Sequence, residues 1–122
     1  MAVLLSTDLM VVSRVQGAAT KAGTTLRSVS TATQAAEQIR AGSEALLVID
    51  LSVPGLDIAA FVAKLEASEG AELRIIAFGP HVHANRLAAA EQAGCDLVVS
   101  RGQFFAQVDA LLGDSRGVTG QG

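Results

Sequence analysis

The chain has 122 residues, a length that fits one domain with its own hydrophobic core. Half of the residues are hydrophobic, yet no apolar run reaches the length of about 18 residues that a membrane span needs, so we expect a soluble protein. The net charge is −3 and the nine Lys and Arg residues are scattered, which argues against a nucleic-acid-binding surface. Cys95 is the only cysteine and no signal peptide is recognisable, so we predict a cytoplasmic location.

Five short apolar runs alternate with segments of helical periodicity. The runs cover residues 2–5, 25–29, 46–49, 73–78 and 97–99. After each run, apolar residues recur at i, i+3 and i+4, as they do on the buried face of a helix. Strand and helix repeated five times predict an α/β fold, a three-layer α/β/α sandwich around a parallel sheet.

The polarity of the runs predicts their order in the sheet. Run 25–29 is interrupted by Arg27 and Ser28 and is therefore expected at an edge. The other four runs are apolar throughout, as strands buried on both faces would be. A flavodoxin-like order of 2-1-3-4-5 places run 25–29 at an edge, and we predict this order.

Small and polar residues mark the expected helix ends. Glycine, which adopts positive φ readily, follows four helical segments at Gly23, Gly42, Gly70 and Gly94. Thr31 and Gln34 have the spacing of a capping box. We predict one domain over residues 1–113 and a Gly-rich, disordered tail over 114–122.

Polar residues follow four strands of the predicted sheet at their carboxyl ends, where ligands bind in open α/β sheets. The residues expected to surround one shallow crevice there are Ser6, Thr7, Asp8, Asp50, Ser52, Gly79 and Arg101. Asp50 ends the third run and is followed by a turn signal. From the residues alone, it is an acid that ends a strand and accepts hydrogen bonds from loop amides.

The stretch "DLSVPGLD", which begins at Asp50, resembles a loop of the receiver domains of two-component response regulators. That family has the pattern Asp-x-x-x-Pro-x-x-Asp-Gly. Pro54 and Asp57 match it, and Ile58 stands in place of the glycine. The resemblance covers residues 1–113 and implies that Asp50 occupies the position of the phospho-accepting aspartate.

The stretch "AAAEQAGCDLVVSRG" is similar to the family's segment that runs through Ala-Gly into the fifth strand and a Lys-Pro pair. Arg101 and Gly102 stand in place of that pair. Arg101 keeps a positive charge and either pairs with Asp50 across the crevice or is a solvated loop residue. Pairing with Asp50 would occupy the carboxylate and make it a poorer nucleophile.

The resemblance also implies a pair of acids after the first strand that helps to hold Mg²⁺. Ser6 and Thr7 occupy those positions, and their neutral hydroxyls are poor substitutes for carboxylates on this hard ion. Asp8 lies one position later and either reaches a metal beside Asp50 or caps the first helix. Because side chains alternate along an extended segment, the cap is favoured.

The residues that read the phosphoryl group in the family are also replaced. Gly79 has no hydroxyl where receivers carry Ser or Thr, and Val98 stands where they usually carry Tyr or Phe. Both halves of the family's conformational relay are therefore missing. These departures predict impaired signalling by aspartyl phosphate.

Two histidines give a second candidate metal site. His81 and His83 would need a third ligand, Asp8 or Asp50; the other interpretation is two surface histidines. The chain has no Tyr or Trp to stack on a flavin, and none of the common nucleotide, hydrolase or redox motifs. We therefore predict no bound cofactor and no enzymatic activity, with Mg²⁺ as the one alternative left open.

These observations predict a stand-alone, degenerate receiver (pseudo-receiver) that binds a kinase or a downstream signalling protein, and neither nucleic acid nor membrane. The resemblance implies that the fourth helix, run 97–99 and the last helix form the partner surface, which would also serve a homodimer. The first alternative is a working receiver phosphorylated at Asp50 in a phosphorelay. The second is a small cofactor- or metal-binding flavodoxin-like protein.

Overall fold

The computed structural model describes residues 2–41, 46–68 and 73–114. Five strands alternate with five helices. The elements are β1 (Ala2–Leu5), α1 (Leu9–Ala22), β2 (Leu26–Val29), α2 (Ala32–Ala41), β3 (Leu46–Asp50), α3 (Ile58–Ser68), β4 (Arg74–Gly79), α4 (Ala84–Ala93), β5 (Leu97–Ser100) and α5 (Arg101–Asp114). Among the described residues, the helices lack the combination of length and hydropathy that a membrane span requires.

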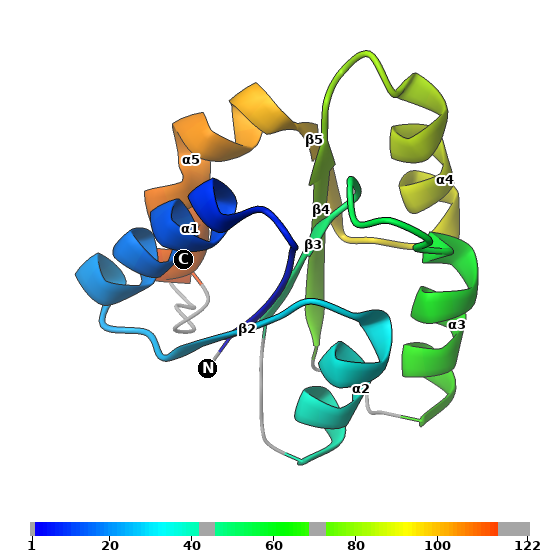
Figure 1. The fold of residues 1–122 in the computed structure, drawn as a ribbon, viewed down its shortest axis with the longest axis horizontal. Coiled ribbons are helices and arrows are strands. Elements are labelled where there is room, and N and C mark those ends of the chain that lie inside the picture. Colours follow the sequence, from blue (N-terminus) through cyan, green and yellow to red (C-terminus); the bar gives the residue numbers. More distant parts are fainter. Residues whose placement is uncertain (1, 42–45, 69–72, 115–122) are drawn as a thin grey trace.

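The strands form one parallel sheet in the order β2-β1-β3-β4-β5, which confirms the predicted topology. Figure 1 shows helices on both sides of it, with α1 and α5 on one face and α2, α3 and α4 on the other. Side chains of a strand point alternately to the two faces. Leu46 and Val48 therefore pack with α1 and α5, whereas Leu47 and Ile49 pack with the other three helices.

The two edge strands are exposed to different degrees. Arg27 and Ser28 of β2 are exposed, as predicted for an edge. The prediction that the fifth run is buried on both faces is wrong, because all four residues of β5 are only partly buried. β5 forms the second edge of the sheet and pairs with β4 alone, which leaves its outer side uncovered by another strand.

Helix ends follow the predicted capping residues closely. Gly23 and Gly94 adopt left-handed φ values of 72° and 100° after α1 and α4, which confirms two of the four predicted glycine caps. The backbone N–H of Gln34 donates to Thr31 Oγ1 at 3.1 Å, as in a capping box, but Gln34 Oε1 accepts from the backbone N–H of Ser30. The other two predicted caps, Gly42 and Gly70, lie outside the described residues.

The predicted tail also falls largely beyond the described part of the chain. Asp114 is the last residue of α5, and residues 115–122 lie outside the described ranges.

Three phenylalanines join β4 to α5. The rings of Phe78 and Phe104 stack with centroids 4.2 Å apart and planes 5° from parallel. Phe105 meets both rings edge-on, at 6.0 and 5.2 Å, and the guanidinium of Arg14 on α1 lies over the Phe105 ring at 4.2 Å. This cluster fixes α5 against the sheet and against α1.

Replacing Phe104 with Ala should destabilise the fold by about 3–5 kcal/mol, because it removes a fully buried ring and leaves a cavity under α5. Gln107→Ala, at an exposed position of the same helix, should change stability by no more than about 0.5 kcal/mol. Urea unfolding followed by circular dichroism measures both. Equal midpoints for the two variants would contradict this role of the stacked rings.

Candidate functional site

The register of the sheet places Ser6 beside Asp50. Leu5 pairs with Ile49, so the next residue of each chain segment lies at the same level of the sheet. Side chains alternate between the two faces along a strand, so Ser6 and Asp50 lie on the same face as Leu4 and Val48, which α1 and α5 cover. Ser6 Oγ donates a hydrogen bond of 2.7 Å to Asp50 Oδ2.

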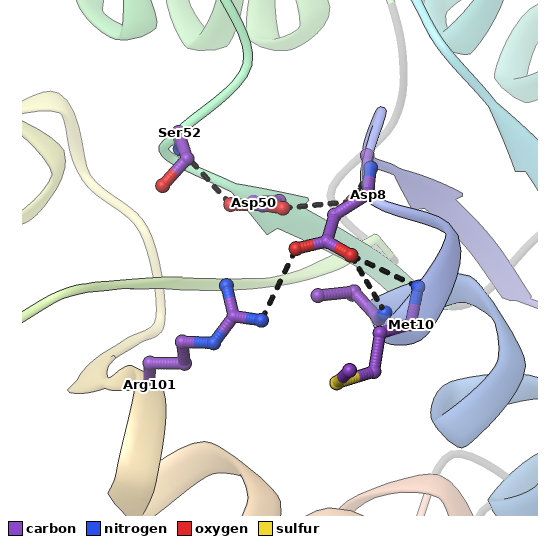
Figure 2. A network of polar contacts seen from close by, with 7 residues as sticks. Asp8, Met10, Asp50, Ser52 and Arg101 are labelled. Carbon is purple, nitrogen blue, oxygen red and sulfur yellow. Dashed lines mark hydrogen bonds and ion pairs between the residues drawn. The ribbon is translucent and has the colours of Figure 1, made fainter.

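Both carboxylate oxygens of Asp50 are hydrogen-bonded. The second oxygen, Oδ1, accepts from the backbone N–H of Ser52 at 2.9 Å (Figure 2), and Asp50 is only 1% exposed. The backbone N–H of Val53 donates to the carbonyl of Asp50, so a turn begins at this residue. Asp50 is thus an acid at a strand end whose carboxylate accepts from one amide of the following loop and from the Ser6 hydroxyl.

Asp8 is the N-cap of α1, as predicted. Its backbone is extended (φ −96°, ψ 114°), and its Oδ1 accepts from the backbone N–H groups of Met10 and Val11 at 2.9 and 3.4 Å. The backbone N–H of Asp8 donates to Ser6 Oγ at 3.1 Å. Ser6 therefore connects the start of α1 to the buried carboxylate of Asp50.

Arg101 neither pairs with Asp50 nor is a solvated loop residue, the two interpretations that the sequence left open. Arg101 instead donates to Asp8 Oδ2 at 3.1 Å (Figure 2). Arg101 is the first residue of α5 and Asp8 immediately precedes α1, and these two helices pack together on one face of the sheet. The packing brings the guanidinium to the cap of the neighbouring helix, while Ser6 and Ser52 already occupy the oxygens of Asp50.

The environment of Asp8 favours its ionised form. The hydrogen bond from Arg101 lowers the pKa of the Asp8 carboxyl below its usual value, and the N–H groups of Met10 and Val11 lower it further, against a smaller opposing effect of desolvation. The Arg101 and Asp8 side chains are 34% and 40% exposed, so solvent and salt screen the pair.

Thr7 does not join this network. It is exposed and lines a hollow of about 410 Å³ at the ends of β1 and β2, together with Ser6, Ser28, Ser30 and Gln34. Of the two hydroxyls that follow β1, only that of Ser6 is hydrogen-bonded to Asp50.

Leu51 covers Gly79, the position at which receivers carry a hydroxyl. A Cβ atom built on Gly79 would lie 3.2 Å from Leu51 Cβ, a tight contact. Leu51 is 4% exposed, and its backbone N–H donates to the carbonyl of Phe78 at 2.8 Å. The loop after β3 is therefore closed against the end of β4.

The residues present do not form a magnesium site. Mg²⁺ requires octahedral oxygen ligands and favours anionic carboxylates. Asp50 has a neutral hydroxyl, Ser6, beside it, and Asp8 is engaged by a cation and a helix N-terminus. In the described ranges, no group of three or more His, Cys, Asp or Glu side chains could hold a metal ion.

The metal-site interpretation of His81 and His83 finds no support among the described residues. His81 is exposed and His83 directly precedes α4. Neither histidine meets Asp8 or Asp50 in a ligand cluster.

Sequence reasoning missed Arg86. Its Nη1 donates to the backbone carbonyl of Leu51 at 3.3 Å and so connects α4 to the loop after Asp50. An arginine at an exposed helical position is common in any soluble protein, and nothing in its sequence neighbourhood distinguishes it.

Comparison with solved structures identifies the fold. The receiver domain of NtrX from Brucella abortus matches with a TM-score of 0.80 and 15% identity over 98% of this chain and 100% of that one. A response regulator receiver domain from Bermanella marisrubri matches with a TM-score of 0.80 and 14% identity over 95% and 97%. The receiver domain of the beryllofluoride-activated NtrC4 dimer gives 0.74 and 13% over 93% and 97%. No protein-family profile and no curated protein sequence matches. The chain has the fold of response regulator receiver domains, as predicted.

Replacing Ser6 with Ala should destabilise the protein by about 1–3 kcal/mol, because Asp50 Oδ2 would lose its partner while remaining buried. Ser52→Ala is the matched control, since the bond from Ser52 comes from its backbone and survives the substitution. Chemical unfolding should show a clear loss for the first variant and a change within about 0.5 kcal/mol for the second. Similar losses in both would show that the hydroxyl of Ser6 is not the important group.

Replacing Asp8 with Asn keeps a good N-cap acceptor but removes the charge that Arg101 binds. The lowered pKa means that the ionised Asp8 contributes stability that is fully present above its usual pKa of about 3.8 and is lost as the pH falls through the lower folded-state value. We expect Asp8→Asn to lower Tm by a few degrees at pH 7 and the deficit to shrink in acid. High salt should also reduce it. A deficit that is independent of pH would contradict the ion pair.

Proposed function

We propose that this chain is a receiver-like signalling module that acts by binding another protein, with impaired Mg²⁺-dependent phosphorylation of Asp50. The observation that carries this proposal is the burial and hydrogen bonding of the Asp50 carboxylate. Its two carboxylate oxygens accept bonds from Ser6 and Ser52, and the side chain is almost fully buried. An attack on phosphorus needs an accessible oxygen with a cation beside it. Asp50 is almost fully buried, and the nearby cation, Arg101, is bound to Asp8.

The second support is the missing relay. A Cβ atom at position 79 would lie 3.2 Å from Leu51 Cβ, so a hydroxyl-bearing side chain there would require Leu51 to shift slightly. Val98, in place of an aromatic ring, is half-buried and packs on the core beneath α2, α3 and α4. A phosphoryl group on Asp50 would thus meet neither of the side chains that read it in working receivers.

The partner surface in this proposal is formed by α4, β5 and α5. β5 is an edge strand whose four residues are all partly exposed. Val82, in the loop that leads into α4, is 73% exposed. An open strand edge with apolar side chains nearby is suited to a protein partner, a kinase or a downstream signalling protein, or to a second copy of this chain. The proposal places the module in the cytoplasm and includes no enzymatic reaction.

Intact-mass spectrometry after incubation with acetyl phosphate and Mg²⁺ tests the proposal. We expect no phosphoryl group on the natural chain, and the same spectrum for Asp50→Ala. A mass gain that Asp50→Ala abolishes would refute impaired phosphorylation and support a working receiver.

A restored variant supplies the positive control. Ser6→Asp, Thr7→Asp and Arg101→Lys together return the acid pair and the lysine of working receivers. Ser6→Asp would place a second carboxylate against Asp50. Two adjacent carboxylates stay ionised together only with a cation between them. We expect this variant to gain Mg²⁺-dependent thermal stability and labelling at Asp50.

A further inference from the structure

A hollow lies between the loop after β3 and helix α4, next to the site but outside it. Its volume is about 420 Å³, within the range of small-molecule sites in proteins. The apolar lining comes chiefly from Val53, Leu56, Ile58 and Ala89. The lining side chains of this hollow include no aromatic ring, so its apolar part suits a flexible aliphatic chain.

Arg86 lies at this hollow without an acidic partner. Its guanidinium donates one hydrogen bond, to the carbonyl of Leu51, out of five available N–H donors. Among the described residues, no carboxylate forms an ion pair with it. A planar cation beside an apolar wall matches a carboxylate that carries an aliphatic chain.

Asp57 is the other charged residue of the lining. Its Oδ1 accepts from the backbone N–H of Ala60 at 3.1 Å, at the start of α3. The negative charge of Asp57 is thus directed to the positive end of a helix dipole, whereas Arg86 retains most of its donors. The hollow therefore favours an anion over a cation.

We propose that this hollow binds a small aliphatic carboxylate, such as a medium-chain fatty acid. The carboxylate would accept hydrogen bonds from the guanidinium of Arg86, and the chain would pack against the side chains of Val53, Leu56, Ile58 and Ala89. The carboxylate would use donors of Arg86 that the carbonyl of Leu51, the residue next to Asp50, leaves free, and would therefore lie at the link between α4 and the loop. This ligand would give the module an input that needs no phosphorylation.

Titration of the ¹⁵N-labelled protein with sodium octanoate tests the proposal by NMR. We expect saturable shifts of backbone amides in residues 51–59 and in α4. Arg86→Gln should weaken binding about tenfold or more, because it removes a charge-assisted hydrogen bond. Arg27→Gln, an exposed arginine on β2, should leave the affinity unchanged.

A second variant and two further ligands complete the test. Ala59→Leu fills the hollow from an exposed position and should also weaken octanoate binding. Octanol and octylamine have the same chain without the carboxylate and should bind more weakly than octanoate. Absence of saturable shifts, equal binding by octanol or octylamine, or full affinity in both Arg86→Gln and Ala59→Leu would overturn the proposal. Octanoate binding is measured without acetyl phosphate or Mg²⁺, so the result does not depend on the phosphorylation test.

Discussion

The parallel register between β1 and β3 is the constraint on which the site depends. Because Leu5 pairs with Ile49, a serine and an aspartate emerge side by side from the buried centre of the sheet. A carboxylate that is 1% exposed is tolerable only if its oxygens are hydrogen-bonded, and the Ser6 hydroxyl and the Ser52 amide meet this requirement. Ser6 also accepts from the amide of Asp8, so one hydroxyl positions both the buried acid and the start of α1.

The charges of the site follow from this arrangement. With the oxygens of Asp50 already bonded, the positive charge of Arg101 goes to Asp8 at the more exposed rim. The negative charge that could attract a divalent cation to the rim is thereby neutralised within the chain. The receiver fold is retained, while the groups that would hold a metal and attack phosphorus have hydrogen-bond partners of their own.

Leu51 links this closed site to the rest of the molecule. Its side chain packs on Gly79, its amide bonds to β4 and its carbonyl accepts from Arg86 on α4. In a working receiver, a change at the phosphorylated aspartate must reach the partner surface through the neighbouring strand and helix. Here the loop, β4 and α4 meet at Leu51, so a ligand bound to Arg86 would lie beside the loop that follows Asp50, with no covalent chemistry required.

The fold and part of the site could be predicted from the sequence because they depend on local patterns. Apolar periodicity gave the five strand–helix units, the polar Arg27 and Ser28 identified one edge strand, and the spacing after the first strand identified Asp8 as a cap. The apolar character of β5 was misleading, because an edge position is a property of the sheet and not of the strand. Asp50 was found as the strand-ending acid because the turn that follows it is encoded locally.

What the tertiary structure alone decided was the partner of each long charged side chain. Arg101 and Asp8 are 93 positions apart in the sequence, and Arg86 lies 35 positions from the carbonyl that it binds. A flexible side chain can reach several groups within its length, so its partner is settled by which helix ends pack together and which acceptors are already occupied. Local sequence carries the signal for an acid at a strand end, but only the packing of α5 against α1 determines that the guanidinium binds a helix cap in place of that acid.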